Sequence, residues 1–290
     1  MRRRSQGKRR KKGNGRSGFF FLLPSLCGVA FFVLLPFAET VRRSFTTAVT
    51  GEWAGFANYR TVLNNTAFRL AADNTLRFVS CALPLLVLPG LLLALMLNRC
   101  RAVRAVKSLL LLPMAMPAAT VVLVWKLVSA PQGFLNLALD QACGDGGQIH
   151  TDYMGSGLAF WVLVFTYVWK NLGYTVILWL AGLQALSGEM KEAAAVDGAG
   201  GITCFFLIEL PNLKPTLYTI TVLSFLNAFK AFREAWLVAG AYPDESIYLL
   251  QHLFNNWFVN LEYDRMAAAA VLVGAALFLV IRVLQRLWDG

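Results

Sequence analysis

Charged side chains are scarce in this sequence. Asp, Glu, Lys and Arg make up 15% of its 290 residues, whereas 57% of the residues are hydrophobic. A soluble globular domain contains about 25% charged and about 45–50% apolar residues. The chain therefore has too few charges to cover an ordinary soluble domain, and its composition is typical of a membrane protein.

The sequence also lacks the patterns of metal sites and of common catalytic sites. Its two histidines, His150 and His252, fall in different loops, and its five cysteines match no zinc-ligand spacing. Cys143 is expected to be the one cysteine on the external side of the membrane, so it has no partner there for an internal disulfide. No arrangement of Ser, His and Asp competes as a catalytic site, and we expect no bound metal.

No segment matches the phosphate-binding pattern G-x-x-x-x-G-K-[ST]. That loop cradles the phosphates of the nucleotide in a large class of ATPases. We therefore expect that this chain neither binds nor hydrolyses ATP, that it is not an enzyme, and that it carries no cofactor of its own.

Long apolar segments recur along the chain, each able to cross a hydrocarbon core, which needs roughly 20 apolar residues. Lipid offers no partner for backbone N–H and C=O groups, so each segment should be a helix, kinked or ended by its prolines. The predicted fold class is an all-α membrane protein with six transmembrane helices. The predicted spans are residues 19–41, 74–97, 105–130, 157–185, 215–239 and 266–287, within a membrane domain of residues 19–288.

A basic tail, residues 1–18, precedes the first span and holds much of the formal net charge of +11. The tail has three interpretations: a topology signal, the start of a cleaved signal peptide, or a nucleic-acid-binding arm. The apolar run after it is longer than a usual signal-peptide core, and no A-x-A cleavage site closes it. We interpret the tail as a cytoplasmic topology signal and expect no nucleic-acid partner.

The orientation follows from the excess of Lys and Arg in short cytoplasmic connections. The second connection and the C-terminal end are basic, whereas residues 131–156 contain no Lys or Arg and three Asp. The first connection is an exception, because its arginines are placed outside. The pattern predicts that both termini and the connection of residues 186–214 lie in the cytoplasm.

This cytoplasmic connection has the pattern of two helices joined by a turn. Glu189 to Val196 forms a short helical run, and Gly198 can close a tight turn with φ > 0. Residues 202–210 then form a second apolar helix, which is predicted to stop at Pro211. Periodicity alone is equally compatible with a plain amphipathic connector that rests on the lipid headgroups.

The same connection resembles the EAA motif of ABC importer permeases: E-A-A, three residues, G, nine residues, I-x-L-P. The matching residues are Glu192, Ala193, Ala194, Gly198, Ile208, Leu210 and Pro211, with Asp197 directly before the glycine. The resemblance implies a coupling helix that docks in a cleft of a separate cytoplasmic ABC ATPase dimer, which holds the ATP and Mg²⁺. It also implies that Glu192 pairs with a basic group of that cleft and that Gly198 lets the helix seat.

Further segments resemble the maltose and glycerol-phosphate type of sugar permeases: FLLPSLCGVAFFVLLPFAETVRRSFT, FANYRTVLNN, LLLPMAMPAATVVLVWKLV and WKNLGYTVILWLAGLQAL. The resemblance implies a subunit of an ATP-driven sugar importer in the bacterial inner membrane. Its implied partners are a second, homologous permease and an extracellular or periplasmic solute-binding protein. One departure lies at residues 239–243, which read AGAYP where these permeases often read GGGP.

Polar residues inside the fourth and fifth spans are candidates for the solute path, because ionisable groups in a membrane are costly. The candidates are Trp169, Lys170, Asn171 and Tyr174, and, on one face of the fifth span, Asn227, Lys230 and Glu234. Sugar hydroxyls need hydrogen-bonding partners, and sugar C–H faces pack on aromatic rings. Alternatively, the long charged side chains lie near the interface and extend towards water.

Two transport mechanisms are compatible with the sequence. The favoured one is an importer permease that works by alternating access with a separate ATPase. An ion-coupled secondary transporter would show paired acids inside the membrane or visible repeat halves, and the sequence contains neither pattern. The sugar itself is not specified, although Lys170 and Lys230 would suit a solute with acidic groups.

Overall fold

The computed structural model describes residues 15–98, 103–143, 151–229, 233, 235–236 and 240–289. In these ranges the regular elements are helices, apart from one isolated bridge between Thr46 and Trp53. Five helical stretches are long and apolar enough to cross a membrane: Leu22–Ser44, Thr66–Asn98, Ala118–Ala142, Ala159–Ala185 and Tyr263–Arg286. The predicted all-α membrane fold is therefore confirmed. The predicted span 215–239 overlaps α12 (Lys214–Ala228), beyond which several residues fall outside the described ranges.

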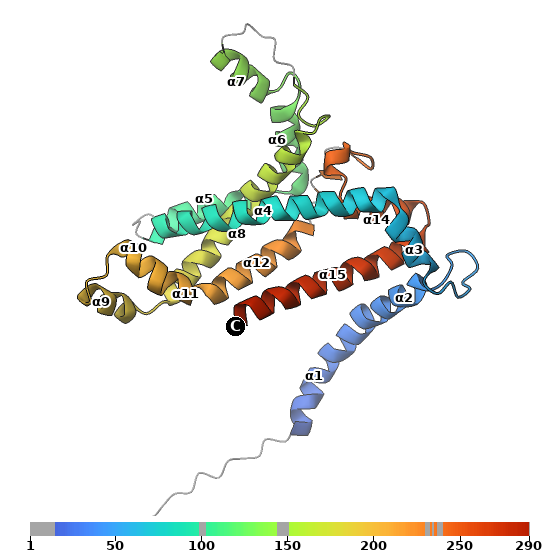
Figure 1. The fold of residues 1–290 in the computed structure, drawn as a ribbon, viewed down its shortest axis with the longest axis horizontal. Helices are drawn as coiled ribbons and strands as arrows, with labels where there is room; N and C mark the ends of the chain where they lie inside the picture. Colours follow the sequence, from blue (N-terminus) through green and yellow to red (C-terminus); the bar gives the residue numbers. More distant parts are fainter. Residues whose placement is uncertain are drawn as a thin grey trace, which may run out of the picture.

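The centre of the molecule is built around α8 (Ala159–Ala185). This helix packs along α4 (Thr66–Asn98) and also contacts α5 (Val103–Ala115) and α12. α15 (Tyr263–Asp289) contacts α12. It also contacts α2 (Leu35–Ser44), a helix of the N-terminal part of the chain. Figure 1 shows these helices running side by side along the length of the molecule.

The two ends of the bundle carry different short helices. One end holds α9 (Gly188–Val196), α10 (Gly201–Cys204) and α11 (Leu210–Asn212), and we refer to it as the loop end. The opposite end holds α3 (Ala57–Asn64) and α14 (Leu250–Val259), as Figure 1 shows.

One apolar face of α4 forms the central contact. Phe78, Ala82 and Leu86 are four residues apart, so they lie on one side of the helix, and all three are buried. Further along the same contact, Trp179 of α8 donates its Nε1–H to the backbone oxygen of Val87, 3.1 Å away. Because a buried indole N–H needs a partner, this bond sets the position of α8 along α4.

Glycines allow α8 to approach its neighbours closely. A Cβ atom at Gly173 would overlap the backbone oxygen of Leu110 in α5, and one at Gly90 of α4 would lie 2.8 Å from Cγ2 of Thr175. Helices in lipid associate through close van der Waals packing, for which small residues are needed at the crossing points. The glycines therefore determine how near α4 and α5 come to α8.

Of the five candidate spans found in the described residues, the first is the least buried. α1 (Gly15–Val29), the π-helical turn η1 (Ala30–Leu34) and α2 follow one another, and apolar side chains such as Phe32 and Phe37 are exposed. Figure 1 shows α1 pointing away from the bundle. Such a surface suits lipid, which solvates apolar side chains while the helix satisfies its own backbone groups.

The apolar segment of residues 105–130 forms two helices that are separated near Pro117. α5 ends at Ala115, and α6 (Ala118–Ser129) begins after Pro117, which has an extended ψ of 142°. Proline has no N–H for the helical bond, and it disfavours helical geometry at the residue before it, here Met116. As a result, α6 and the following α7 (Phe134–Cys143) extend away from the bundle (Figure 1).

Two prolines are instead accommodated by π-helical turns. η1 is followed by Leu35 and Pro36, and η2 (Phe205–Glu209) is followed by Leu210 and Pro211. The prediction that the second apolar helix of the connection stops at Pro211 is wrong, because helical structure continues to Asn212. In a π turn each N–H donates to the carbonyl five residues earlier, and here the N–H of Leu210 donates to Phe205 O. The next residue, Pro211, has no N–H to donate.

Side chains of α4 tie down the segment that precedes α14. The Nδ2 group of Asn74 donates to the backbone oxygens of Glu245 and Tyr248, and Thr75 Oγ1 accepts from the N–H of Leu250 at 3.1 Å. These bonds satisfy backbone groups that would otherwise be buried without partners. The segment therefore has a defined place against the N-terminal part of α4.

His252 of α14 is the basis of a pH prediction. Its ring is fully buried beside Tyr248, and burial lowers the pKa of His252 from 6.5 to about 4. The unfolded chain therefore binds an extra proton between these values, so stability is full above pH 6.5 and is lost as the pH falls towards 4. We expect the free energy of unfolding to drop by about 2 kcal/mol between pH 7.5 and pH 5.

Thermal unfolding of the purified protein in detergent at both pH values measures this loss. His252→Asn is the matched variant, because an amide oxygen can replace Nδ1, which accepts the N–H of Leu249 at 3.2 Å. The variant should lose less stability at pH 5 than the wild type. An identical pH dependence in both proteins would show that His252 is not responsible.

Candidate functional site

The connection at the loop end contains a short helix with a tightly closed C-terminus. Gly198 has a φ of 81°, in the left-handed region. The N–H of Gly198 donates to Ala195 O at 3.1 Å, and the N–H of Ala199 donates to Ala194 O at 2.9 Å. This pair of bonds is the Schellman arrangement, which satisfies the last carbonyls of a helix and favours glycine at this position.

The motif residues divide into an exposed set and a partly buried set. Ala194 is the buried member of α9 and faces the rest of the loop end. The residues on the other faces of α9 and its turn are exposed, namely Glu192, Ala193, Asp197 and Gly198. Ile208 and Leu210 are partly buried, whereas Pro211 is exposed. α9 therefore presents a surface of small and acidic residues away from the bundle.

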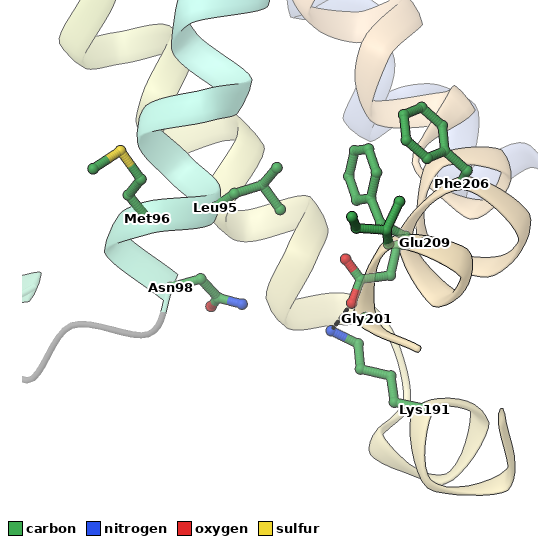
Figure 2. A pocket seen from close by; sticks show the side chains of 9 residues that line it. Leu95, Met96, Asn98, Lys191, Gly201, Phe206 and Glu209 are labelled. Atoms are coloured by element: carbon green, nitrogen blue, oxygen red, sulfur yellow. Dashed lines mark ion pairs between the residues drawn. The ribbon is translucent and has the colours of Figure 1, made fainter. Parts of the chain in front are cut away.

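A cleft of about 790 Å³ lies between the connection and the end of α4. Figure 2 shows Leu95, Met96 and Asn98 of α4 on one side of it, and Lys191 and Glu209 on the other. Nζ of Lys191 lies 2.8 Å from Oε1 of Glu209, so α9 and η2 are joined by an ion pair. Sequence patterns did not identify this pair, because the two residues lie in separate helices with a turn between them.

The candidates of the fourth span lie together in the middle of α8. Trp169, Lys170, Asn171 and Tyr174 are all partly buried. The ring of Trp169 packs edge-on against Trp125 of α6, with ring centres 6.3 Å apart, and Phe165 packs against the same indole at 5.3 Å. The Nδ2 group of Asn171 donates to Tyr167 O at 2.8 Å, within its own helix.

The fifth-span candidates are only partly within the described residues. Asn227 lies near the end of α12 and is partly buried, whereas Lys230 and Glu234 lie outside the described residues. α8 and α12 are joined where the hydroxyl of Tyr167 donates to the backbone oxygen of Ser224 at 2.7 Å. Asn227 lies about one turn beyond Ser224 on α12, so the two groups of candidates flank this contact.

Two further aromatic residues belong to this region but were not predicted from the sequence. Trp125 and Tyr167 read in the sequence as ordinary members of apolar spans. The sequence contained one signal for an aromatic partner. Phe165 and Trp169 are four residues apart, so they share a helical face that an aromatic residue of a neighbouring helix can cover. The partner, Trp125, is determined by the crossing of α6 and α8 and has no signal in the local sequence.

Comparison with known proteins identifies the family. Residues 86–289 match the family described as "Binding-protein-dependent transport system inner membrane component". The chain is 28% identical over 269 residues to the trehalose/maltose transport system permease protein MalF of Thermococcus litoralis, with 90% of each chain covered. It is 33% identical over 229 residues to the diacetylchitobiose uptake system permease protein DasB of Streptomyces coelicolor, covering 76% of this chain and 69% of that protein.

The fold is also shared with a solved structure. This chain superposes with a TM-score of 0.81, at 21% sequence identity, on a chain of a bacterial ABC transporter involved in the import of the acidic polysaccharide alginate. The alignment covers 94% of this chain and 95% of that chain. The helical arrangement described above is therefore the fold of an ABC importer subunit. Together with the family match, it establishes that this chain belongs to the inner membrane components of binding-protein-dependent transport systems, the permeases of ABC importers.

Proposed function

We propose that this chain is the transmembrane subunit of an ATP-driven sugar importer and forms half of its translocation pathway. The observation that carries the proposal is the connection at the loop end, where a full EAA pattern coincides with an exposed helix closed by Gly198. The names of the relatives support sugar as the solute class, because they include permeases for trehalose and maltose and for diacetylchitobiose.

In this proposal the protein is a multi-pass protein of the bacterial inner membrane with both termini in the cytoplasm. The basic tail of residues 1–18 and the connection of residues 186–214 face the cytoplasm, and the membrane domain comprises residues 19–288. The excess of Lys and Arg in the second connection and at the C-terminal end supports this orientation.

The connection couples the permease to an ATPase. A cytoplasmic ABC ATPase dimer binds ATP and Mg²⁺, and its cleft receives α9 with Glu192 paired to a basic group. The exposed small side chains around Ala193 permit close approach of the partner surface. The absence of a phosphate-binding loop in the sequence supports the assignment of hydrolysis to that separate subunit.

The solute passes between this chain and a second, homologous permease. Trp169, Lys170, Asn171, Tyr174 and Asn227 contribute aromatic and polar groups to the path, together with Lys230 and Glu234. A periplasmic or extracellular binding protein delivers the sugar on the side opposite α9. A solved relative of the same fold was crystallised with an alginate pentasaccharide-bound periplasmic protein, which supports this partner class.

Transport by the reconstituted complex tests the proposal. The chain is co-expressed with the permease, ATPase and binding protein encoded beside it, purified, and placed in proteoliposomes. We expect the ATPase to co-purify with the chain, and uptake of labelled sugar to require ATP and to persist when ionophores remove ion gradients. Uptake that needs an ion gradient and no ATPase would establish the alternative, an ion-coupled secondary transporter.

A further inference from the structure

The ion pair of Lys191 and Glu209 bridges two parts of the connection that the glycine turn separates. Figure 2 shows the Lys191 side chain reaching from α9 to the carboxylate of Glu209 at the end of η2, 2.8 Å away. Other pairs, such as Arg42–Glu39 and Arg77–Asp73, join residues three or four positions apart in one helix. The Lys191–Glu209 pair instead links two helices.

This pair is less exposed to water than the pairs within single helices. The Glu209 side chain is 16% exposed and the Lys191 side chain 33% exposed. Phe205 and Phe206 line the same cleft and exclude part of the surrounding water. Exposed pairs contribute little because water screens them, whereas loss of one partner from a buried pair leaves a charge that nothing compensates.

The backbone between the two charges contains three glycines. Gly198 and Gly200 lie between α9 and α10, Gly201 is the first residue of α10, and a Cβ atom at any of them would meet no atom within 4 Å. Glycine has the largest conformational freedom of any residue, so this stretch does not hold α9 in place by itself. The ion pair adds a second connection across the bend and prevents α9 from turning independently of η2.

The chain after Glu209 leads directly to the core. Helical structure continues through α11 to Asn212, Leu213 is fully buried, and α12 begins at Lys214. On α12, the backbone oxygen of Ser224 accepts the hydrogen bond of Tyr167, next to the proposed solute path. The segment after Glu209 therefore connects η2 directly to α12.

We propose that Lys191 and Glu209 are a positioning pair that locks α9 to η2, so that movement of α9 by the ATPase displaces α12 instead of bending the glycine turn. This inference rests on the proposed function. Neither residue occupies a defined position of the EAA pattern, so the pair adds a separate element to the coupling mechanism of this chain.

The test uses the complete transporter in proteoliposomes and measures ATP hydrolysed per sugar imported. Lys191→Glu and Glu209→Lys should each raise this ratio by about fivefold or more, with the ATPase still co-purifying. The double charge swap should restore the ratio. The neutral double variant Lys191→Met with Glu209→Gln leaves no buried charge, so it should fold and assemble but remain uncoupled. Lys214→Glu, an exposed lysine of the same connection, should change the ratio by less than about twofold.

The outcomes separate this inference from the proposed function. If the wild-type complex imports sugar with ATP but the neutral double variant is as well coupled as the wild type, the positioning role is wrong. A double swap that stays as defective as the worse single variant would also overturn it. If the wild-type chain binds no ATPase or imports sugar without ATP, the proposed function itself fails.

Discussion

ATP-driven sugar uptake is expected to fall about 30-fold or more when Glu192 is replaced by Lys, because removal of one partner of a buried interfacial charge pair costs about 2–5 kcal/mol. Glu192 is exposed on α9 of the isolated chain, so the substitution should leave the fold intact. In the assembled importer the new lysine would face the basic group of the ATPase cleft. Uptake in proteoliposomes and co-purification of the ATPase measure the effect.

Glu189→Lys is the matched control for this prediction. Glu189 lies on the same helix, is exposed, and undergoes the same change of charge, but it is not part of the EAA pattern. We expect its uptake to stay within about threefold of wild type, as for other exposed substitutions. Equal uptake by wild type and Glu192→Lys, with the ATPase still bound, would refute the proposed role of Glu192.

Gly173→Ala is expected to destabilise the protein by about 1–3 kcal/mol, because an added methyl group must force α5 away from α8. The atom in the way is the backbone oxygen of Leu110, which has no rotamer by which to move aside. Separation of the helices would also weaken the other contacts between α5 and α8. The midpoint of thermal or denaturant unfolding in detergent measures the loss.

Gly274→Ala in α15 is the matched control, with the opposite expected sign. A Cβ atom at Gly274 meets nothing within 4 Å. Alanine should therefore stabilise this helix by up to about 1 kcal/mol, because glycine loses more conformational freedom on folding. If Gly173→Ala behaved like Gly274→Ala, the close approach of α5 and α8 would be contradicted.

Features that depend on nearby residues were predictable from the sequence. The apolar runs around Phe78 and Trp179 are long enough to span a membrane, so they had to be helices that satisfy their own backbone groups. The glycine turn at Gly198 was also predictable, because a left-handed φ after a short helical run favours that residue type. The fold class followed from these local properties together with the motif resemblance.

The effect of individual prolines on the helices could not be predicted from the sequence. Pro117 separates α5 from α6, whereas Pro211 is accommodated behind a π turn, although both prolines directly follow an apolar residue. Whether a helix breaks or widens depends on what the surrounding helices offer to the freed carbonyl groups. That information is not contained in the neighbouring sequence.

The sequence by itself determined the membrane class, the helical fold and the position of the connection that contains Glu192, because each depends on composition, periodicity or contiguous pattern. Only the tertiary structure decided that Lys191 meets Glu209, that Trp125 covers Trp169, and that Gly173 touches the backbone of α5. These contacts join residues of different helices. They depend on crossing angles and on the length of the turns between helices, which arise only when the whole chain packs.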